Sequence, residues 1–359
     1  MGPNILIVGL GLIGGSIGLA LQGSPAVNQI IGSDRDPLVV EKALKLGAID
    51  TAASLETGAK KADIIILCTP ISTFPDIIAA IRNDLKPGTI ITDAASTKYQ
   101  VMEMFAHLPE QVFAVGGHPM AGGEAPGIIN ADKYLFENAV YVLTPAPGTP
   151  DEITAKLMAV LKTTGADMLI MEAARHDEIT AAISHIPHIA ASALVSLTHG
   201  ERDKLNMAAG GFRDTTRIAS SDPVLWRQIL FSNREPVIEG LDEFIDILNG
   251  IRHLLRENNE TELYRILEEA RQIRSEIPQV RKGLLPGFVD VICIVPDKPG
   301  IIGNLGNIMG AENINIVDLE ILHVRDGDGG TIRIGVPSAD KAILAVEALK
   351  KHAVKAWVR

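Results

Sequence analysis

The feature that most constrains the fold of this chain is a glycine fingerprint near its beginning. A short apolar run leads into GLGLIGGS, in which Gly9, Gly11 and Gly14 have the spacing G-x-G-x-x-G. These glycines follow a predicted strand and open a predicted helix, and Asp34 ends the next apolar run twenty residues after Gly14. A Rossmann dinucleotide-binding unit requires this context, so the pattern predicts a dinucleotide site in an α/β fold.

Each part of the fingerprint has an expected role. Gly9 would make the tight turn, Gly11 would admit the pyrophosphate, and Gly14 would let helix and strand pack closely, with the helix N-terminus facing the phosphates. Asp34 would accept hydrogen bonds from the adenosine ribose, which favours NAD; Arg35 beside it leaves NADP as the less favoured alternative. A glycine-rich turn without a nucleotide is the other interpretation. Further predicted cofactor contacts are Leu12, Ile13 and Thr69.

The pattern of apolar runs divides the chain into three predicted domains. Residues 1–170 alternate short apolar runs with helical stretches, which predicts a Rossmann-like domain with a parallel sheet covered on both faces. Residues 171–280 show helical periodicity with little strand character and predict an all-α domain. After a linker at 281–288, residues 289–359 return to a β-α-β-β-α order with a last short strand, typical of a ferredoxin-like α+β module.

Composition limits the partners and the compartment. The 359 residues carry a net charge of −11, which argues against a nucleic-acid surface or an anionic membrane as partner. Cys68 and Cys293 lie inside apolar runs and are expected to be buried strand residues in a reducing compartment. We see no secretory signal and no apolar stretch of membrane-spanning length, so the expectation is a cytoplasmic protein.

A histidine in the run GGHPMAG, at residues 116–122, is the candidate base. His118 lies between Gly117 and Pro119 in a predicted glycine-rich loop, where the backbone can approach a ligand closely. An imidazole titrates near neutral pH and can accept a proton. A structural loop histidine is the alternative, and the dinucleotide fingerprint upstream makes it the weaker one.

The segment TDAASTK, residues 92–98, follows a predicted strand at the carboxyl edge of the sheet, where ligands bind in this fold. Ser96 would orient the imidazole of His118 or bond to the substrate, and it would equally serve as the N-cap of a helix at 98–106. Lys98 is expected to be a solvated side chain or a ribose contact rather than a catalytic base.

A long helix is predicted from about residue 172 to 198, with a kink near Pro187 because proline lacks a backbone donor. It carries His185 and His188 three positions apart on one face. No acidic residue or cysteine completes a ligand set, so we expect no metal here. A hydrogen bond from His185 to the substrate is the favoured interpretation.

The segment 210–226, GGFRDTTRIASSDPVLW, brings Arg213, Asp214 and Arg217 close together. In a helix the two arginines share one face, and a guanidinium there would hold a substrate carboxylate through two hydrogen bonds. Asp214 would fix one of the arginines. A surface ion pair is the alternative interpretation.

Together these motifs resemble the prephenate/arogenate dehydrogenase family. The matching segments, in chain order, are GLGLIGGS, TDAASTK, GGHPMAGGE, HDEITAAISHIPH and FRDTTRIASSDPVLW. The resemblance implies a Rossmann-like domain, a helical dimerisation domain that forms a homodimer, and a substrate cleft between them. The implied reaction is the NAD-dependent oxidative decarboxylation of prephenate to 4-hydroxyphenylpyruvate in tyrosine biosynthesis, in which loss of CO2 makes the ring aromatic.

The resemblance also implies roles for single residues. His118 would bond the C4 hydroxyl and accept its proton as hydride passes to the nicotinamide, and Ser96 would orient His118. Arg217 matches the arginine that pairs with a substrate carboxylate, and His185 resembles the pocket histidine. Gly123 departs from the family pattern, since many relatives carry a hydroxyl or larger polar residue there. Further implied pocket positions are Glu124 and Trp226.

The C-terminal segment resembles an ACT domain, a small regulatory fold that binds amino acids. Pro299 and Gly300 would form the turn that opens a helix at Ile301. The implied ligand is L-tyrosine as a feedback inhibitor, although such modules also pair edge to edge and can serve dimerisation alone. The candidate ligand contacts are Asn304, Asn315 and Asp318.

Three functions therefore compete. NAD-dependent prephenate dehydrogenase leads, and an arogenate dehydrogenase or a dual-specificity cyclohexadienyl dehydrogenase is the nearest alternative. The alternative outside enzymes is a sensor in which NAD and an amino acid regulate assembly with a partner. A base beside a carboxylate clamp speaks for catalysis, since a sensor has no use for both.

Overall fold

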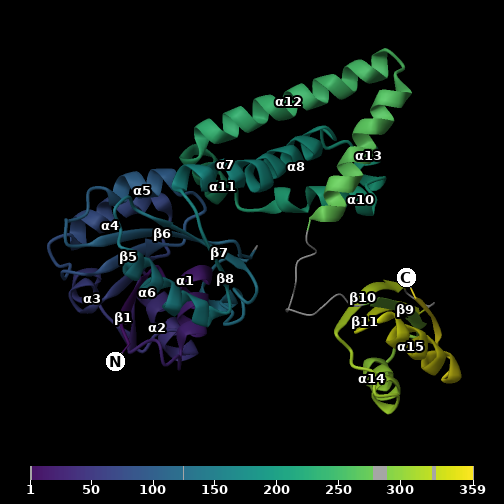
Figure 1. Ribbon diagram of the computed structural model, residues 1–359, viewed down its shortest axis with the longest axis horizontal. Coiled ribbons are helices and arrows are strands. Elements are labelled where there is room, and N and C mark those ends of the chain that lie inside the picture. Colours follow the sequence, from purple (N-terminus) through teal and green to yellow (C-terminus); the bar gives the residue numbers. More distant parts are fainter. Residues whose placement is uncertain (1, 124, 278–288, 326–328, 359) are drawn as a thin grey trace. The chain divides into compact units, whose positions relative to one another are not determined.

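The computed structural model describes residues 2–123, 125–277, 289–325 and 329–358. The chain divides into two compact units, residues 1–277 and 278–359, each of which is considered by itself (Figure 1).

The first unit begins with an eight-stranded sheet in the order β3-β2-β1-β4-β5-β6-β7-β8. Its central strands are apolar and buried on both faces, as expected of a sheet between two helical layers. The strands are β1 (Asn4–Val8), β2 (Gln29–Ser33), β3 (Thr51–Ala52), β4 (Ile64–Leu67), β5 (Ile90–Asp93), β6 (Phe113–Pro119), β7 (Val140–Pro145) and β8 (Asp167–Ile170).

Alternate residues of β1 belong to two different hydrophobic clusters, one on each face of the sheet. Ile5 and Ile7 pack in the cluster that includes α1 and α6, whereas Leu6 and Val8 pack in the cluster that includes α3, α4 and α5. This arrangement confirms the predicted Rossmann-like domain. The helices are α1 (Leu12–Leu21), α2 (Pro37–Leu46), α3 (Leu55–Lys61), α4 (Phe74–Ile81), α5 (Tyr99–Phe105) and α6 (Asp151–Leu161), with 3-10 turns η1 (Ile71–Thr73) and η3 (Lys162–Thr164).

The prediction of a parallel sheet is wrong at one pair of strands. β6 and β7 pair antiparallel, with His118 opposite Val142, while the other neighbouring strands pair parallel. Among the described residues between them, the 3-10 turn η2 (Ile128–Asn130) is the only helical element. A parallel pairing needs a crossover connection, usually a helix, so β7 instead runs back along β6.

An all-α region follows the sheet and confirms the predicted helical domain. Its first helix is continuous from α7 through a π turn, η4, into α8, and the π turn ends at His185 just before Pro187. The structure thus has a widened turn beside the place of the predicted kink. The elements are α7 (Ala173–Thr180), η4 (Ala181–His185), α8 (Ile186–Ser196), α9 (Arg202–Asn206), α10 (Gly210–Thr216), η5 (Arg217–Ser220), α11 (Pro223–Ser232), α12 (Arg234–Arg256) and α13 (Glu260–Glu276).

The continuous helix over residues 173–196 is long and apolar enough to cross a membrane by length and composition alone, with a mean hydropathy of 1.3. The expectation that no apolar stretch reaches that length is therefore wrong. Core helices of globular domains pass the same test, and this helix buries His176, Asp177 and His185. All three make hydrogen bonds inside the unit.

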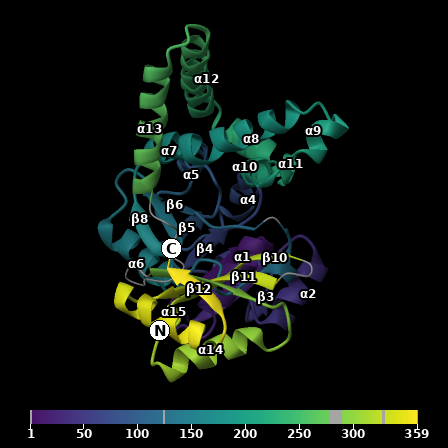
Figure 2. The same ribbon diagram turned by 90° about the vertical axis from the view of Figure 1, so that its right-hand side faces the viewer.

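The second unit contains a four-stranded antiparallel sheet in the order β10-β11-β9-β12 and two helices (Figure 2). A hydrophobic cluster lies between the sheet and the helices. The chain order β-α-β-β-α-β is the one expected of a ferredoxin-like module. The linker predicted at 281–288 lies outside the described residues. The elements are β9 (Val289–Val295), α14 (Ile301–Ala311), β10 (Asp318–Arg325), β11 (Gly329–Val336), α15 (Ala339–Lys351) and β12 (Lys355–Val358).

Candidate active site

The glycine fingerprint forms a cradle of the shape that a dinucleotide needs. Gly9 has φ +91°, and a Cβ on Gly14 would lie 1.9 Å from the carbonyl oxygen of Gly9, so neither position accepts a side chain without rearrangement. A Cβ on Gly11 would meet nothing within 4 Å. Gly11 is also the N-cap of α1 and supplies no side-chain cap. The open space beside free helix N–H donors fits a pyrophosphate.

Asp34 fixes the fingerprint turn from the end of β2. Its Oδ2 accepts a hydrogen bond from the backbone N–H of Leu10 at 2.8 Å, and its Oδ1 accepts one from the N–H of Asp36 at 3.0 Å. Each carboxylate oxygen retains a lone pair for a ribose hydroxyl. Arg35 is exposed beside it.

A cavity of about 390 Å³ joins the fingerprint to the candidate catalytic residues. This volume lies within the range of small-molecule sites. Its wall combines the sheet domain with α11 of the helical domain. The residues lining it include Gly11, Leu12, Ile13, Cys68, Thr69, Ser96, Thr97, His118, Gly122, Gly123, Leu225, Gln228, Ile229 and Ser232.

His118 lies in strand β6, so the prediction of a glycine-rich loop around it is wrong. A Cβ on Gly116 would lie 2.3 Å from Thr144 Oγ1, and a Cβ on Gly117 would lie 2.4 Å from the carbonyl oxygen of Asp93. These two glycines therefore let β6 pack against its neighbours, and they do not open the backbone to a ligand. Gly122, beyond the strand, has open space around it.

The expectation that Lys98 is solvated or contacts the ribose is also wrong. Its side chain is fully buried and forms an ion pair with Asp93, and its Nζ donates to the carbonyl oxygen of Gly117 at 2.6 Å. Burial lowers the pKa of Lys98 and raises that of Asp93, while the attraction between them opposes both shifts. The pair fixes the backbone directly before His118.

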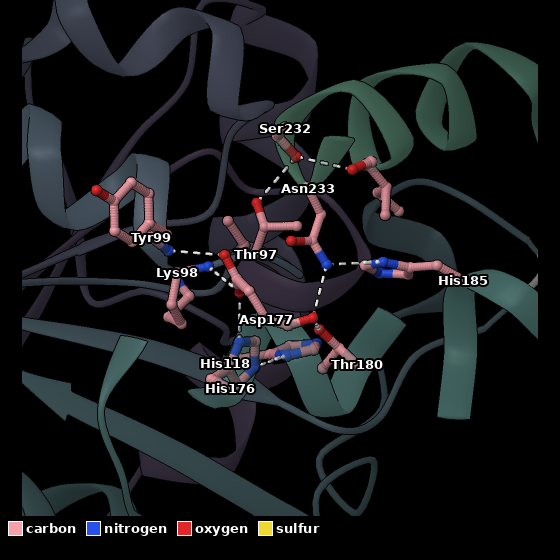
Figure 3. A network of polar contacts seen from close by, with 12 residues as sticks. Thr97, Lys98, Tyr99, His118, His176, Asp177, Thr180, His185, Ser232 and Asn233 are labelled. Carbon is pink, nitrogen blue, oxygen red and sulfur yellow. Dashed lines mark hydrogen bonds and ion pairs between the residues drawn. The ribbon is translucent and has the colours of Figure 1, made fainter. Parts of the chain in front are cut away.

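His118 belongs to a chain of hydrogen bonds that sequence reasoning missed (Figure 3). Its Nδ1 lies 2.8 Å from Nε2 of His176, and Nδ1 of His176 lies 2.7 Å from Oδ1 of Asp177. Both new residues lie on α7 and are buried. The motif HDEITAAISHIPH contains them, but no local spacing indicates that α7 reaches β6.

Asp177 also caps a helix of the sheet domain. Its Oδ1 accepts from the backbone N–H of Lys98 at 2.7 Å, and its Oδ2 accepts from the N–H of Tyr99 at 2.8 Å. These are the free donors at the start of α5, so the carboxylate substitutes for a local N-cap. The alternative that Ser96 caps this helix is therefore wrong. Ser96 lines the cavity beside His118.

His185 is held in a defined orientation by Asn233. The Nδ2 of Asn233 lies 2.8 Å from the carbonyl oxygen of Asp177, which can only accept, so this atom is the amide donor. The same nitrogen lies 3.1 Å from Nδ1 of His185. Nδ1 therefore accepts, and the proton of neutral His185 is on Nε2. His185 is buried and is not among the described residues that line the cavity.

Burial keeps the imidazoles of His118 and His185 neutral. It lowers the pKa of His118 well below 6.5, and the nearby His176, Lys98 and His185 lower it further. Burial also lowers the pKa of His185 to about 4, against the opposing effect of Asp177. A neutral imidazole is the form that can accept a proton.

Trp226 lies against both His188 and His185. Its ring stacks on His188 at 3.6 Å between centroids and meets His185 edge-on at 6.1 Å. The Nδ1 of His188 is buried without a hydrogen-bond partner among the described residues. The described residues contain no cluster of metal-ligating side chains.

The predicted clamp for a substrate carboxylate does not line the cavity. Arg213, Asp214 and Arg217 are exposed, on α10 and at the start of η5, and are not among the described residues that line the cavity. Glu124 lies outside the described residues. The structure thus brings Ser96, His118 and the fingerprint together directly, and leaves the arginines at the surface of the helical region.

The second unit has a cavity of its own, of about 560 Å³, around the turn at Pro299 and Gly300. None of the candidate ligand residues Asn304, Asn315 and Asp318 is among the described residues that line it. Asp318 instead forms an ion pair with Arg333 at 2.5 Å, and Arg333 also pairs with Asp290 and Glu320.

A nucleotide cradle that shares a cavity with a half-buried, neutral imidazole is typical of a dehydrogenase, and comparisons with known proteins agree. Residues 17–170 match the nucleotide-binding domain and residues 172–269 the dimerization domain of prephenate dehydrogenase. The Prephenate dehydrogenase of Bacillus subtilis is 38% identical over 98% of this chain and 97% of that protein. The chain belongs to the prephenate dehydrogenase family.

Solved structures of such enzymes are similar to most of this chain. Prephenate dehydrogenase from Aquifex aeolicus, in complex with hydroxyphenyl propionate and NAD+, has a TM-score of 0.71 and 33% identity over 77% of this chain and 99% of that chain. Arogenate dehydrogenase from Synechocystis has a TM-score of 0.69 and 34% identity, covering 77% of this chain and 100% of that one.

Proposed function

We propose that this protein is an NAD-dependent prephenate dehydrogenase. It would convert prephenate and NAD+ to 4-hydroxyphenylpyruvate, CO2 and NADH. The observation that carries this proposal is the single cavity that joins the open space at Gly11 to the imidazole of His118. The full-length similarity to a Prephenate dehydrogenase supports it.

Bound NAD+ would accept the hydride that leaves C4 of the substrate ring. His118 would accept the proton of the C4 hydroxyl, so that C4 becomes a carbonyl. The bond from C1 to the ring carboxylate then breaks, CO2 leaves, and its electron pair makes the ring aromatic. His118 would return its proton to the C4 oxygen, so the reaction releases no net proton.

The other site residues would bind and orient the reactants. Ser96, on the cavity wall, would orient His118 or bond the substrate hydroxyl. His185 would donate its Nε2–H to the substrate. Arg217 would pair with a substrate carboxylate. The remaining pocket positions of the proposal are Glu124, Asp214 and Trp226. Asp34, Gly9, Gly14, Thr69 and the start of α1 would hold the dinucleotide, with Arg35 exposed beside the ribose position.

Arogenate is the second candidate substrate, because this chain is about as similar in fold to an arogenate dehydrogenase as to a prephenate dehydrogenase. Arogenate carries an ammonium group where prephenate carries a ketone. We expect a higher kcat/KM with prephenate than with arogenate when NADH formation is followed at 340 nm. Equal values would indicate a dual-specificity enzyme, and no NADH from either substrate would overturn the proposal in favour of a sensor.

A homodimer is part of this proposal. The helical region exposes large apolar side chains that a monomer would leave in water, including Phe231 at 73%, Met207 at 83% and Tyr264 at 69% exposure. The match to a dimerization domain covers these residues. Light scattering should give twice the mass of one chain, and a monomeric mass at micromolar concentration would contradict this part.

The second unit would be an ACT regulatory domain at residues 289–359, after a helical domain at 171–280 and a linker at 281–288. Its fold order and the cavity at Pro299 and Gly300 support this proposal. L-Tyrosine would bind there and inhibit, in an enzyme that we expect to be cytoplasmic. Deleting residues 289–359 should abolish inhibition by tyrosine, and unchanged inhibition would contradict a regulatory role.

A further inference from the structure

We propose that His176 and Asp177 are positioning residues that fix the tautomer of His118, so that its Nε2 is the atom that accepts the substrate proton. The inference rests on the proposed function for the identity of the substrate. The hydrogen bonds that carry it do not depend on which substrate binds.

The argument begins at Asp177, whose two oxygens face donors only. The backbone N–H groups of Lys98 and Tyr99 donate to Oδ1 and Oδ2, and neither group can act as an acceptor. The Nδ1 of His176 approaches Oδ1 to 2.7 Å. A carboxylate in this position accepts, so Nδ1 of His176 carries the proton.

The tautomer of His176 then determines the tautomer of His118. When His176 carries its proton on Nδ1 alone, its Nε2 has a lone pair, and this Nε2 lies 2.8 Å from Nδ1 of His118. The rings meet edge-on, at an interplanar angle of 72°. In that form of His176, Nδ1 of His118 donates the hydrogen bond and its Nε2 carries the lone pair. Among the described residues, the hydrogen bond of the His118 side chain is the one from Nδ1 to His176, and His118 lines the cavity.

The same chain connects one carboxylate to His118. Burial and the nearby His176, Lys98 and His185 lower the pKa of His118 and so disfavour a positive charge there. Of the two nearby carboxylates, Asp93 is paired with Lys98. Asp177 is the one connected to His118, through His176. In other enzymes a carboxylate behind a histidine holds the reactive tautomer and stabilises the imidazolium, and here a second imidazole lies between them.

A direct test is the 15N NMR spectrum of histidine-labelled protein, with the His118 signals assigned by their loss in His118→Asn. Nitrogen shifts distinguish a protonated ring nitrogen from one with a lone pair. We expect neutral His118 in the wild type to carry its proton on Nδ1. A proton on Nε2 would overturn the inference, and this readout needs neither substrate nor a variant of His176.

Steady-state kinetics of variants test whether this hydrogen bond from His118 to His176 supports turnover. His176→Phe keeps a ring but removes the acceptor, and we expect kcat to fall about 10²-fold while KM stays near the wild-type value. His176→Gln offers an amide oxygen as acceptor and should recover part of kcat. Thr180→Val is the matched control, because it removes a hydrogen bond to the carbonyl oxygen of Asp177 on the same helix but leaves both imidazoles in place.

The outcomes separate this inference from the proposed function. Wild-type kcat in folded His176→Phe would overturn the positioning role, whereas prephenate turnover by the wild type would still support the proposed function. A wild type without turnover would overturn the proposed function and leave the NMR test of the tautomer intact. If His176→Phe does not fold, the wild-type spectrum alone decides.

Discussion

The glycine fingerprint and the imidazole chain border the same cavity, but the sequence specifies them in different ways. Gly9, Gly11 and Gly14 act within one turn of chain, and Asp34 closes that turn through Leu10. The contact between His118 and His176 spans 58 positions, and that between Lys98 and Asp177 spans 79. The cofactor cradle is a local structure, whereas the state of the base depends on how two domains pack.

The largest effect should follow from replacing the base. His118→Asn removes the proton acceptor, and general base catalysis contributes about 10²–10⁴-fold, so kcat should fall by that factor. Binding of NAD+, measured by fluorescence quenching, should be unchanged because the fingerprint is untouched. Full turnover by the variant would show that His118 is not the base, and a loss of NAD+ binding would show that the two regions are not independent.

A smaller loss is expected at the proposed clamp. Arg217→Ala removes charge-assisted hydrogen bonds worth about 1.5–3 kcal/mol, equivalent to a rise of about 10–100-fold in KM for prephenate. Steady-state kinetics should show this rise with kcat less affected. Arg202→Ala, at an exposed position of α9, serves as a matched control. An unchanged KM in Arg217→Ala would exclude the clamp.

Two glycines of the fingerprint should separate folding from cofactor binding. Gly14→Ala places a Cβ 1.9 Å from the carbonyl oxygen of Gly9, so it should lower the Tm as well as weaken NAD+ binding. Gly11→Ala meets only open space, so its Tm should stay near the wild-type value while the Kd for NAD+ rises. Thermal scans with and without NAD+ measure the Tm of each variant. Equal losses of Tm in Gly14→Ala and Gly11→Ala would contradict the separate roles of the two glycines.

The smallest effect is in the pH dependence. The pKa of His118 lies well below 6.5, so kcat/KM should stay level as the pH falls through 6.5 and decline only at lower pH, where the imidazole is protonated. The unfolded chain binds this proton more readily, so the free energy of unfolding should decrease below pH 6.5. An activity midpoint at or above 6.5 would contradict the effect of burial on His118.

Much of the fold could be predicted because its signals are local. The fingerprint, the alternation of apolar runs, and the return of strand character after the helical region each depend on neighbouring residues, and the structure has these elements at those places. The antiparallel pair of β6 and β7 could not be predicted in this way. It depends on a connection that lacks a long helix, which apolar periodicity in the flanking strands does not reveal.

The candidate site was predictable in part. Ser96 and His118 could be found because each follows a predicted strand or lies in a distinctive motif, and both line the cavity with the fingerprint. Lys98 was misjudged because a lysine is rarely buried, and the buried partner that explains it, Asp93, was not recognised. His176, Asp177 and Asn233 were missed since only the packing of the helical region on the sheet gives them their contacts.

The central claim is that one cavity unites a dinucleotide with an imidazole base for the oxidative decarboxylation of prephenate. The most direct measurement is the amount of NADH and of CO2 formed when the purified protein is given prephenate and NAD+. We predict equal molar amounts of the two, with 4-hydroxyphenylpyruvate as the organic product. No NADH, or NADH without CO2, would contradict the account.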